Sequence, residues 1–413
     1  MKLWNFDAKS SRRNGTALDV YSFEAEASSD GGEKELAAFG KRQQLRACSP
    51  PAPSLSLTRT NAPFHIAQLR LLFHSRPDMH VDGDMGRSIL RVFTFGLTNG
   101  GPAGLVYGFI ICWIGTTALF CSLAEMASAV PLAGGQYSMV SEYAPEGTGN
   151  FLAYVTGWLT CLGWQAATAS SAYLGGTMVQ GLIVLNKPSY EPQRWQGTLL
   201  FYAMILVSVI FNTFLAKFLP KVEGLILIIH VAGFFGVLIP LVHLAPHGSG
   251  SDVFTQFSNG GEWSTQGLSF CIGIVTGVYA FLGADSACHL AEEIPNASKV
   301  VPRVMVATTL LNGILGFAAL MAILFCAGNI ENALETPTGY PFIEIFYQAT
   351  DSTGGATAMT CIILALVFFA TIGLIATASR MTWAFARDNG LPGSRWLAKV
   401  SLSTFPSKFL PSN

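Results

Sequence analysis

A glycine and a carboxylate lie close together inside an apolar stretch of this sequence. The stretch runs from Gly277 to Glu293 and reads GVYAFLGADSACHLAEE, with Gly283 and Asp285 in its apolar part. A carboxylate at bilayer depth is costly, so such residues usually face a cavity or a partner. Glycine is a poor helix former, and a broken helix is tolerated in a membrane only where the freed backbone lines a cavity. The pattern predicts an interrupted helix at a binding site.

Two further titratable residues, Glu223 and His230, lie seven positions apart in another apolar stretch. That spacing is about two turns of an α-helix, which places both side chains on one face. Because histidine titrates near physiological pH, the pair are candidates for a proton relay. The alternative is that His230 is simply hydrogen-bonded within its helix.

Enzymatic and metal chemistry find no support in the sequence. It contains no paired-histidine metal motif, and no nucleophile stands beside a base. Seven of the eight cysteines fall in apolar segments, at spacings that match neither a metal motif nor a disulfide framework. We expect them to be packing residues. We therefore expect no enzyme activity, no metal and no cofactor.

The elements that carry these residues must be membrane helices. Of the 413 residues, 51% are hydrophobic and only 12% are charged, a composition too apolar for a soluble enzyme. The net charge of -1 gives no indication of a nucleic-acid partner. Seven stretches are long and apolar enough to span a bilayer, at about 104–128, 151–173, 198–216, 223–245, 268–290, 304–327 and 357–378. We predict an all-α, polytopic membrane protein that contacts lipid.

The spanning segments divide the chain into three regions. Residues 1–103 are polar and are predicted to form a largely disordered, cytosolic N-terminal region. Residues 104–378 form the predicted membrane domain, and residues 379–413 a cytosolic tail. Lys and Arg follow the third, fifth and seventh segments, whereas the loops at 246–266 and 328–356 contain neither. By the positive-inside rule, these two loops face outward.

Three polar motifs between and after the spanning segments resemble one transporter family. They read SLAEMASAVPLAGGQY at 122–137, AEEIPNASKVVPR at 291–303 and SRMTWAFARDNGLPGSRWLAKV at 379–400. Together they resemble the amino acid/polyamine/organocation permease superfamily, and in detail its fungal amino acid, GABA and choline permease branch. The resemblance covers about 92–400 and a short run, EKELAAFGKRQQLR, further upstream.

The resemblance implies a fold of about twelve helices, built on two inverted repeats, that moves small organic cations or zwitterions across a membrane. By position, the seven segments look like helices two to eight of that fold. The segment at 268–290 then looks like the sixth helix, which is unwound at the midplane in this family and holds the substrate.

Site roles follow from the resemblance where residues match. Tyr279 and Phe281 would stack on the substrate, with cation–π attraction to an ammonium group. Gly283 would be the unwinding point, and Asp285 would meet substrate charge or a coupling proton. The alternative is that the two aromatic residues are packing residues and that Asp285 pairs with a neighbouring helix.

Other polar and aromatic residues of the motifs are expected to have structural roles. Glu125, Glu292 and Glu293 are expected to belong to cytosolic gates or caps. Trp158 and Trp164 are expected to be packing or interface residues.

The sequence also departs from the family pattern. A Pro-broken stretch at 47–91 stands where the family has its first helix, and the resemblance stops at Lys399-Val400, before helices nine to twelve. Two hypotheses follow. The first is a proton-coupled permease of an amino acid, a GABA-like or a choline-like solute in the plasma membrane or an organelle membrane. The second is a truncated chain that does not transport, is retained in the endoplasmic reticulum and associates at most with other permease chains.

Overall fold

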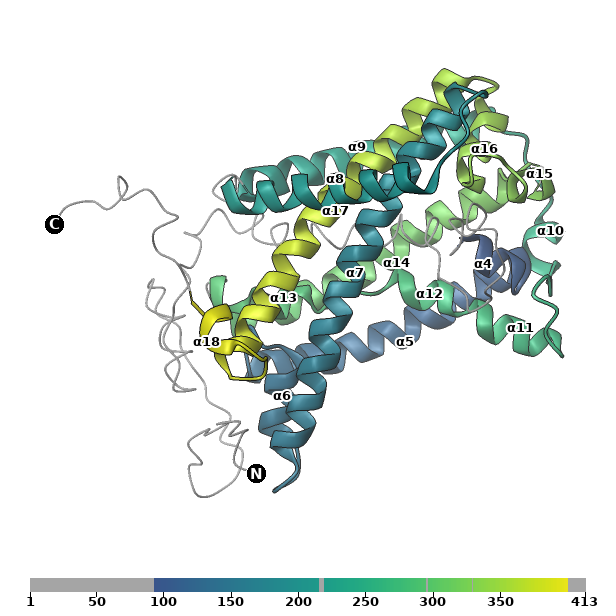
Figure 1. Ribbon diagram of the computed structural model, residues 1–413. Coiled ribbons are helices and arrows are strands. Elements are labelled where there is room, and N and C mark those ends of the chain that lie inside the picture. Colours follow the sequence, from purple (N-terminus) through teal and green to yellow (C-terminus); the bar gives the residue numbers. More distant parts are fainter. Residues whose placement is uncertain (1–92, 215–218, 295, 329, 400–413) are drawn as a thin grey trace.

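The computed structural model describes residues 93–214, 219–294, 296–328 and 330–399 (Figure 1). For residues 94, 219–227 and 331 it describes the backbone alone. Every named element in these ranges is a helix, and the one β-bridge there, between Asn99 and Asn259, is isolated. The all-α prediction is confirmed. The predictions for residues 1–92, including the stretch at 47–91, and for 400–413 lie outside the described residues.

The long helices are α5 (Gly101–Ala129), α7 (Gly149–Asn186), α8 (Arg194–Phe214), α9 (Leu219–Leu244), α14 (Ala297–Phe325) and α17 (Thr353–Arg387). The short helices are α4 (Phe93–Thr98), α6 (Gln136–Tyr143), α10 (Gly250–Thr255), α11 (Gln266–Gly273), α12 (Val275–Ala280), α13 (Ser286–His289), the 3₁₀ helix η2 (Ala291–Glu293), α15 (Ile330–Leu334), α16 (Pro341–Thr350) and α18 (Ser394–Leu397).

Each of the seven predicted segments corresponds to helical structure. Within the described ranges, four helices, α5, α8, α14 and α17, are long and apolar enough to cross a membrane. The part of α9 with described side chains and the α11–α12 pair are shorter apolar helices. The second predicted segment, at 151–173, lies within α7, which extends over 38 residues. The predicted fifth segment at 268–290 is not one helix but is divided among α11, α12 and α13.

The helical part is longer at both ends than the predicted region at 104–378. At its start, α4 places Phe93 and Leu97 in the core, so these residues do not belong to a polar tail. At its end, α17 continues to Arg387 because Met381 and Phe385 are fully buried. The N-terminus of α17 is capped by Ser352, whose hydroxyl accepts a hydrogen bond from the Gly355 backbone N–H.

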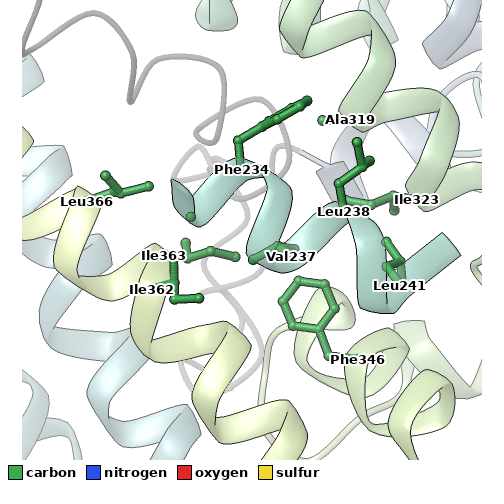
Figure 2. Close-up of a pocket in the computed structure, with 11 residues that line it drawn as sticks. Phe234, Val237, Leu238, Leu241, Ala319, Ile323, Phe346, Ile362, Ile363 and Leu366 are labelled. Carbon is green, nitrogen blue, oxygen red and sulfur yellow. The ribbon is translucent and has the colours of Figure 1, made fainter. Parts of the chain in front are cut away.

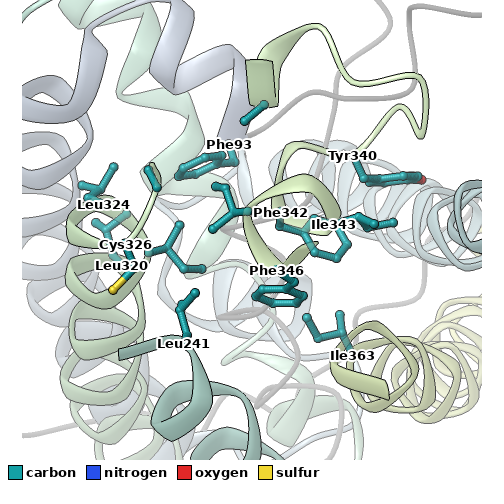
Figure 3. Packing of buried hydrophobic residues seen from close by; sticks show 14 of the residues in the cluster. Phe93, Leu241, Leu320, Leu324, Cys326, Tyr340, Phe342, Ile343, Phe346 and Ile363 are labelled. Atoms are coloured by element: carbon teal, nitrogen blue, oxygen red, sulfur yellow. The ribbon is translucent and has the colours of Figure 1, made fainter. Parts of the chain in front are cut away.

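The largest hydrophobic cluster lies where α4, α5, α9, α14, α16 and α17 meet (Figure 3). Phe93, Leu241, Leu320, Phe346 and Ile363 are all at most 3% exposed in it. Lipid is as apolar as these side chains, so burial from water does not drive helices together within a bilayer. Close packing of side chains must therefore hold this cluster together.

A small cavity of about 30 Å³ remains between α9, α14, α16 and α17 (Figure 2). Phe234, Leu238, Ile323, Phe346 and Ile362 are among its lining residues, and all of the lining is apolar. A cavity of this size and lining stays dry and cannot hold a charged solute. It is a packing gap rather than a substrate site.

The short helices gather at two opposite ends of the molecule (Figure 1). At one end, α6, α13 and α18 lie beside the last turns of α5 and α17. At the other, α4, α10, α11, α15 and α16 lie together. The three sequence motifs at 122–137, 291–303 and 379–400 therefore converge on the first end, although they are far apart along the chain.

Glycines let the long helices approach one another closely. A Cβ atom on Gly176 of α7 would lie 2.8 Å from the Phe201 backbone nitrogen of α8. A Cβ atom on Gly313 of α14 would overlap the Trp113 ring of α5. Small residues at such positions are typical of helix pairs in membranes. By contrast, a Cβ atom on Gly163 of α7 would meet nothing within 4 Å.

We expect Gly176→Ala to destabilise the protein and Gly163→Ala to leave it unchanged or slightly more stable. Gly176→Ala forces the α7 and α8 backbones apart, and overpacking of this kind costs about 1–3 kcal/mol. Gly163→Ala adds a methyl group in open space on the same helix and improves helix propensity by up to about 1 kcal/mol. Thermal unfolding of the purified chain in detergent measures both. Equal unfolding midpoints for the two variants would contradict the packing.

Candidate functional site

The site is organised by a break in the helical chain between α12 and α13. Residues 281–285 form turns, and Gly283 at their centre has a φ of 103°. Side chains other than hydrogen rarely allow this conformation, so glycine is what permits the chain to turn here. The break therefore lies where the glycine and the neighbouring carboxylate predicted an interrupted helix.

Asp285, at the end of the break, is hydrogen-bonded to a residue from another part of the chain. The Gln136 amide Nε2 donates to Asp285 Oδ2. Gln136 is the first residue of α6 and follows the glycine pair Gly134-Gly135. Both Gln136 and Asp285 are partly exposed. Through this bond the break is joined to the turn between α5 and α6.

His289 fixes the position of that turn from the other side. Its Nδ1 lies 2.9 Å from the Ala133 carbonyl oxygen, and the Trp164 indole Nε1 donates to its Nε2 at 2.9 Å. A Cβ atom on Gly135, which has a φ of 58°, would lie 2.8 Å from His289 Cε1. The imidazole ring therefore packs directly on the glycine turn, in a position that no larger residue would allow.

These two contacts determine the tautomer of His289. An indole N–H can only donate, so His289 Nε2 must accept and cannot carry a proton. Nδ1 then carries the proton and donates to the Ala133 carbonyl. His289 is 1% exposed and both of its ring nitrogens are satisfied. It is a neutral structural link between α7, α13 and the glycine turn.

Two Arg–Glu ion pairs join the end of the broken segment to α17. Arg387 binds Glu292 through both terminal nitrogens, at 2.7 and 2.8 Å. Arg380 binds Glu293 through Nε and through a terminal nitrogen at 3.1 Å. The Glu292 side chain is 1% exposed and that of Glu293 is 19% exposed, so the first pair is the more deeply buried. Paired geometry of this kind suits the fork of the guanidinium group.

The same cluster of polar residues reaches α6. The Tyr137 hydroxyl donates to Asp388 Oδ2 at 2.9 Å. Burial, together with the negative charge of Asp388, raises the pKa of Tyr137 well above its usual value, so the phenol remains a neutral donor. The Ala133 backbone N–H donates to Glu292 Oε1 at 3.3 Å. Glu292 and Glu293 thus link the three motifs.

The two aromatic residues before Gly283 point to different neighbours. The Tyr279 hydroxyl lies 2.9 Å from Ser170 Oγ on α7. Phe281 is 2% exposed and packs against Phe109 of α5, with ring centroids 5.1 Å apart. Phe281 therefore belongs to the hydrophobic core in this structure, which is the packing role left open for it above.

The two residues of the predicted proton relay, Glu223 and His230, lie on α9, whereas Asp285 precedes α13 and Gln136 begins α6. His230 lies on α9 and is 3% exposed. The principal neighbours of α9 are α14, α16 and α17, whereas Asp285 contacts the turn before α6. Glu223 also lies on α9, in the part where only the backbone is described.

A larger cavity of about 550 Å³ lies at the opposite end of the molecule. Its lining includes His247, Asp252, Gln256 and Phe325, around α10 and the end of α14. Neither Asp285 nor Gln136 lines it. Among the residues that the structure describes, no group of three or more His, Cys, Asp or Glu side chains is placed to hold a metal ion.

Comparison with known proteins identifies the family. The sequence profile described as amino acid permease matches residues 85–410. The chain belongs to the amino acid permease family. A protein of Macrophomina phaseolina that carries the name of an amino acid/polyamine transporter is 34% identical over 311 residues, covering 75% of this chain and 68% of that protein.

Two other fungal relatives agree with this assignment. The choline transporter of Saccharomyces cerevisiae is 32% identical, over 75% of this chain and 55% of its own length. Amino-acid permease 2 of Neurospora crassa is 28% identical, over 78% of this chain and 60% of its own length. The chain thus spans a little over half of the length of these two relatives. The permease resemblance and the polytopic membrane class predicted from the sequence are confirmed, and a permease is a transporter rather than an enzyme.

Several residues that organise the candidate site were not singled out as site residues from the sequence. Gln136 and His289 contact the broken segment directly, and Trp164 was expected only to pack. Two features of the sequence could have indicated them: the glycine pair before Gln136 and the polar end of the GADSACHLAEE run. Glu292 and Glu293 were expected in gates or caps, but their arginine partners on α17 were not identified.

We expect Trp164 and His289 to be energetically coupled. His289→Phe leaves the Trp164 N–H and the Ala133 carbonyl without their partner, which costs about 1–3 kcal/mol of unfolding free energy. In a double-mutant cycle with Trp164→Phe, the coupling energy should reach about 0.5–3 kcal/mol. Trp158→Phe on the same helix is the matched control and should be additive with His289→Phe. Additivity of both pairs would contradict the direct bond.

We expect the two ion pairs to differ in strength. Arg387→Met leaves the buried Glu292 carboxylate without its arginine partner, which costs about 3–5 kcal/mol. Arg380→Met removes the partner of the more exposed Glu293, which costs about 1 kcal/mol. Thermal unfolding of the purified chain compares the two variants under the same conditions. An Arg380→Met loss as large as the Arg387→Met loss would show that burial does not decide their strength.

Proposed function

We propose that this chain takes part in the transport of amino acids or related amines across a membrane, coupled to protons. The observation that carries the proposal is the half-buried carboxylate of Asp285 beside the helix break at Gly283. Broken helices at membrane depth serve binding sites in secondary transporters, because the freed backbone groups can face solute. A carboxylate there can meet an ammonium group or a proton.

The proposed solute is GABA-like, choline-like or an amino acid, which have a positively charged nitrogen in common. The printed names of the relatives, which include a choline transporter and an amino-acid permease, are in keeping with this range. In this proposal Asp285 supplies the opposite charge. Tyr279 precedes the break, and its hydroxyl contacts Ser170 of α7. Phe281 would contact solute only if it left its place against Phe109.

Proton coupling is assigned to Asp285 first, with His230 and Glu223 as further candidates on α9. We also propose that the helices from α4 to α17 form the membrane-embedded permease domain, in the plasma membrane or an organelle membrane. The end where α6, α13 and α18 gather would be cytosolic, because basic residues follow α8, α13 and α17 along the chain.

We expect Asp285→Asn to reduce solute uptake by at least about tenfold, the change that corresponds to about 1.4 kcal/mol. The substitution preserves shape and removes the charge. Uptake of radiolabelled GABA, choline and amino acids is measured in a yeast strain that lacks its own permeases, and a protonophore should abolish it. Binding to the purified chain is measured in parallel as ligand-induced thermal stabilisation.

Asp351→Asn is the matched control, because Asp351 is exposed at the C-terminus of α16, and α16 and α13 lie at opposite ends of the molecule (Figure 1). Its uptake and expression should equal those of the unmodified chain. Normal uptake by the Asp285→Asn variant would exclude the assigned role of this carboxylate. Neither uptake nor stabilisation with any of the solutes would contradict the proposed function as a whole.

A further inference from the structure

We propose that Gln136 and Ser286 complete the amine end of the site and select protonated amines that carry N–H groups over quaternary ammonium compounds. This inference rests on the proposed function and deepens it, because it names the substrate class of the site around Asp285. Both residues lie next to that carboxylate, Gln136 by a hydrogen bond and Ser286 by its position in the chain.

The orientation of the Gln136 amide follows from its partner. An ionised carboxylate can only accept, so the amide must present its N–H to Asp285 and turn its oxygen away. That oxygen, Oε1, is buried and has no hydrogen-bond partner among the described residues. A buried acceptor without a partner is costly and needs an explanation. A donor on a bound solute would provide one.

Ser286 carries a second buried polar group without a partner among the described residues. It follows Asp285 directly, is 1% exposed and begins α13. Its hydroxyl Oγ is buried and also has no partner within the described part of the chain. Two buried polar groups without partners among the described residues thus belong to the immediate neighbours of Asp285, one bonded to its carboxylate through the same amide and the other on the next residue. A hydroxyl can accept from an N–H group, as the amide oxygen can.

The turn that carries Gln136 is held in place before any solute arrives. Both backbone polar groups of Ala133 are hydrogen-bonded: its carbonyl to His289 and its N–H to Glu292. Gly135 packs against the imidazole ring. The amide oxygen is therefore positioned by rigid neighbours, which lowers the entropy lost when a solute binds.

This arrangement matches the chemistry of a primary or secondary ammonium group. Its positive charge pairs with Asp285, while its N–H groups donate to Gln136 Oε1 and Ser286 Oγ. A quaternary ammonium group has the charge but no N–H, so it would cover both acceptors with methyl groups. Sites built to hydrogen-bond a substrate group discriminate strongly against analogues that lack it.

Two pairs of probes isolate this difference, since each pair differs only in N-methylation. They are ethanolamine with choline, and GABA with its N,N,N-trimethyl derivative. Affinity for the purified full chain is measured by ligand-induced thermal stabilisation over a concentration series. For the unmodified chain we expect the N–H member of at least one pair to bind at least about tenfold more tightly than its methylated partner.

Gln136→Met keeps the length of the side chain and removes its acceptor. We expect it to weaken binding of the N–H probe about tenfold and to leave binding of the methylated probe unchanged. Ser286→Ala should act in the same direction and serves if Gln136→Met fails to fold. Gln165→Met is the matched control: it changes an exposed amide on α7, hydrogen-bonded to Thr382, and should alter neither affinity.

The outcomes separate this inference from the proposed function. Tighter or equal binding of the methylated probes in the unmodified chain would overturn the inference and leave the proposed function intact. An equal loss for both members of a pair in Gln136→Met and in Ser286→Ala would also overturn it, because the residues would then only position Asp285. Absence of binding by all four probes would contradict the proposed function from which the inference starts.

Discussion

A helix that breaks inside a membrane must give its backbone groups new partners, because lipid offers none. In this permease, short-range turns between α12 and α13 meet part of that requirement. The Phe281 N–H donates to the Val278 carbonyl at 3.2 Å, Leu282 to Tyr279 at 3.3 Å and Ser286 to Gly283 at 3.0 Å. Only Gly283 has a positive φ in this segment. These three bonds keep part of the turn's backbone paired within the segment, with Asp285 at its end.

The broken segment would nevertheless be loose without contacts to the helices around it. Three kinds of contact hold it: the amide of Gln136 on Asp285, the His289 ring between Trp164 and Ala133, and the two arginines of α17 on Glu292 and Glu293. All of them lie at the end of the molecule where the three sequence motifs meet. Movement of η2, which follows α13, away from α17 would break the two ion pairs together, so the broken segment and the end of α17 are mechanically linked.

Away from the site, the long helices are held by close packing. Gly176 lets α7 approach the α8 backbone, and Gly313 admits the Trp113 ring between α14 and α5. Phe281 connects this packing to the break, since it lies against Phe109 at the edge of the main hydrophobic cluster. A change in the turn at Gly283 would thus be transmitted directly to α5.

The sequence by itself determined the helical membrane class, the approximate helices and the place of the break. These properties depend on local composition: long apolar runs need helices in lipid, and glycine beside an intramembrane carboxylate disfavours a continuous helix. It also predicted that Glu292 and Glu293 belong to cytosolic gates or caps, and this stays a prediction. The ends of the helical part were less predictable, because α17 continues to Arg387 through residues whose burial depends on other helices.

The tertiary structure alone decided which residues surround the break. Gln136 and Asp285 are 149 positions apart, and Trp164 and His289 are 125 positions apart. A single sequence does not say which distant positions touch. The partner of the Asp285 carboxylate and the tautomer of His289 could therefore not be predicted from it. The direction of Phe281 was equally undetermined, because α12 ends at Ala280 and beyond that end the helical periodicity no longer tells which way a side chain points.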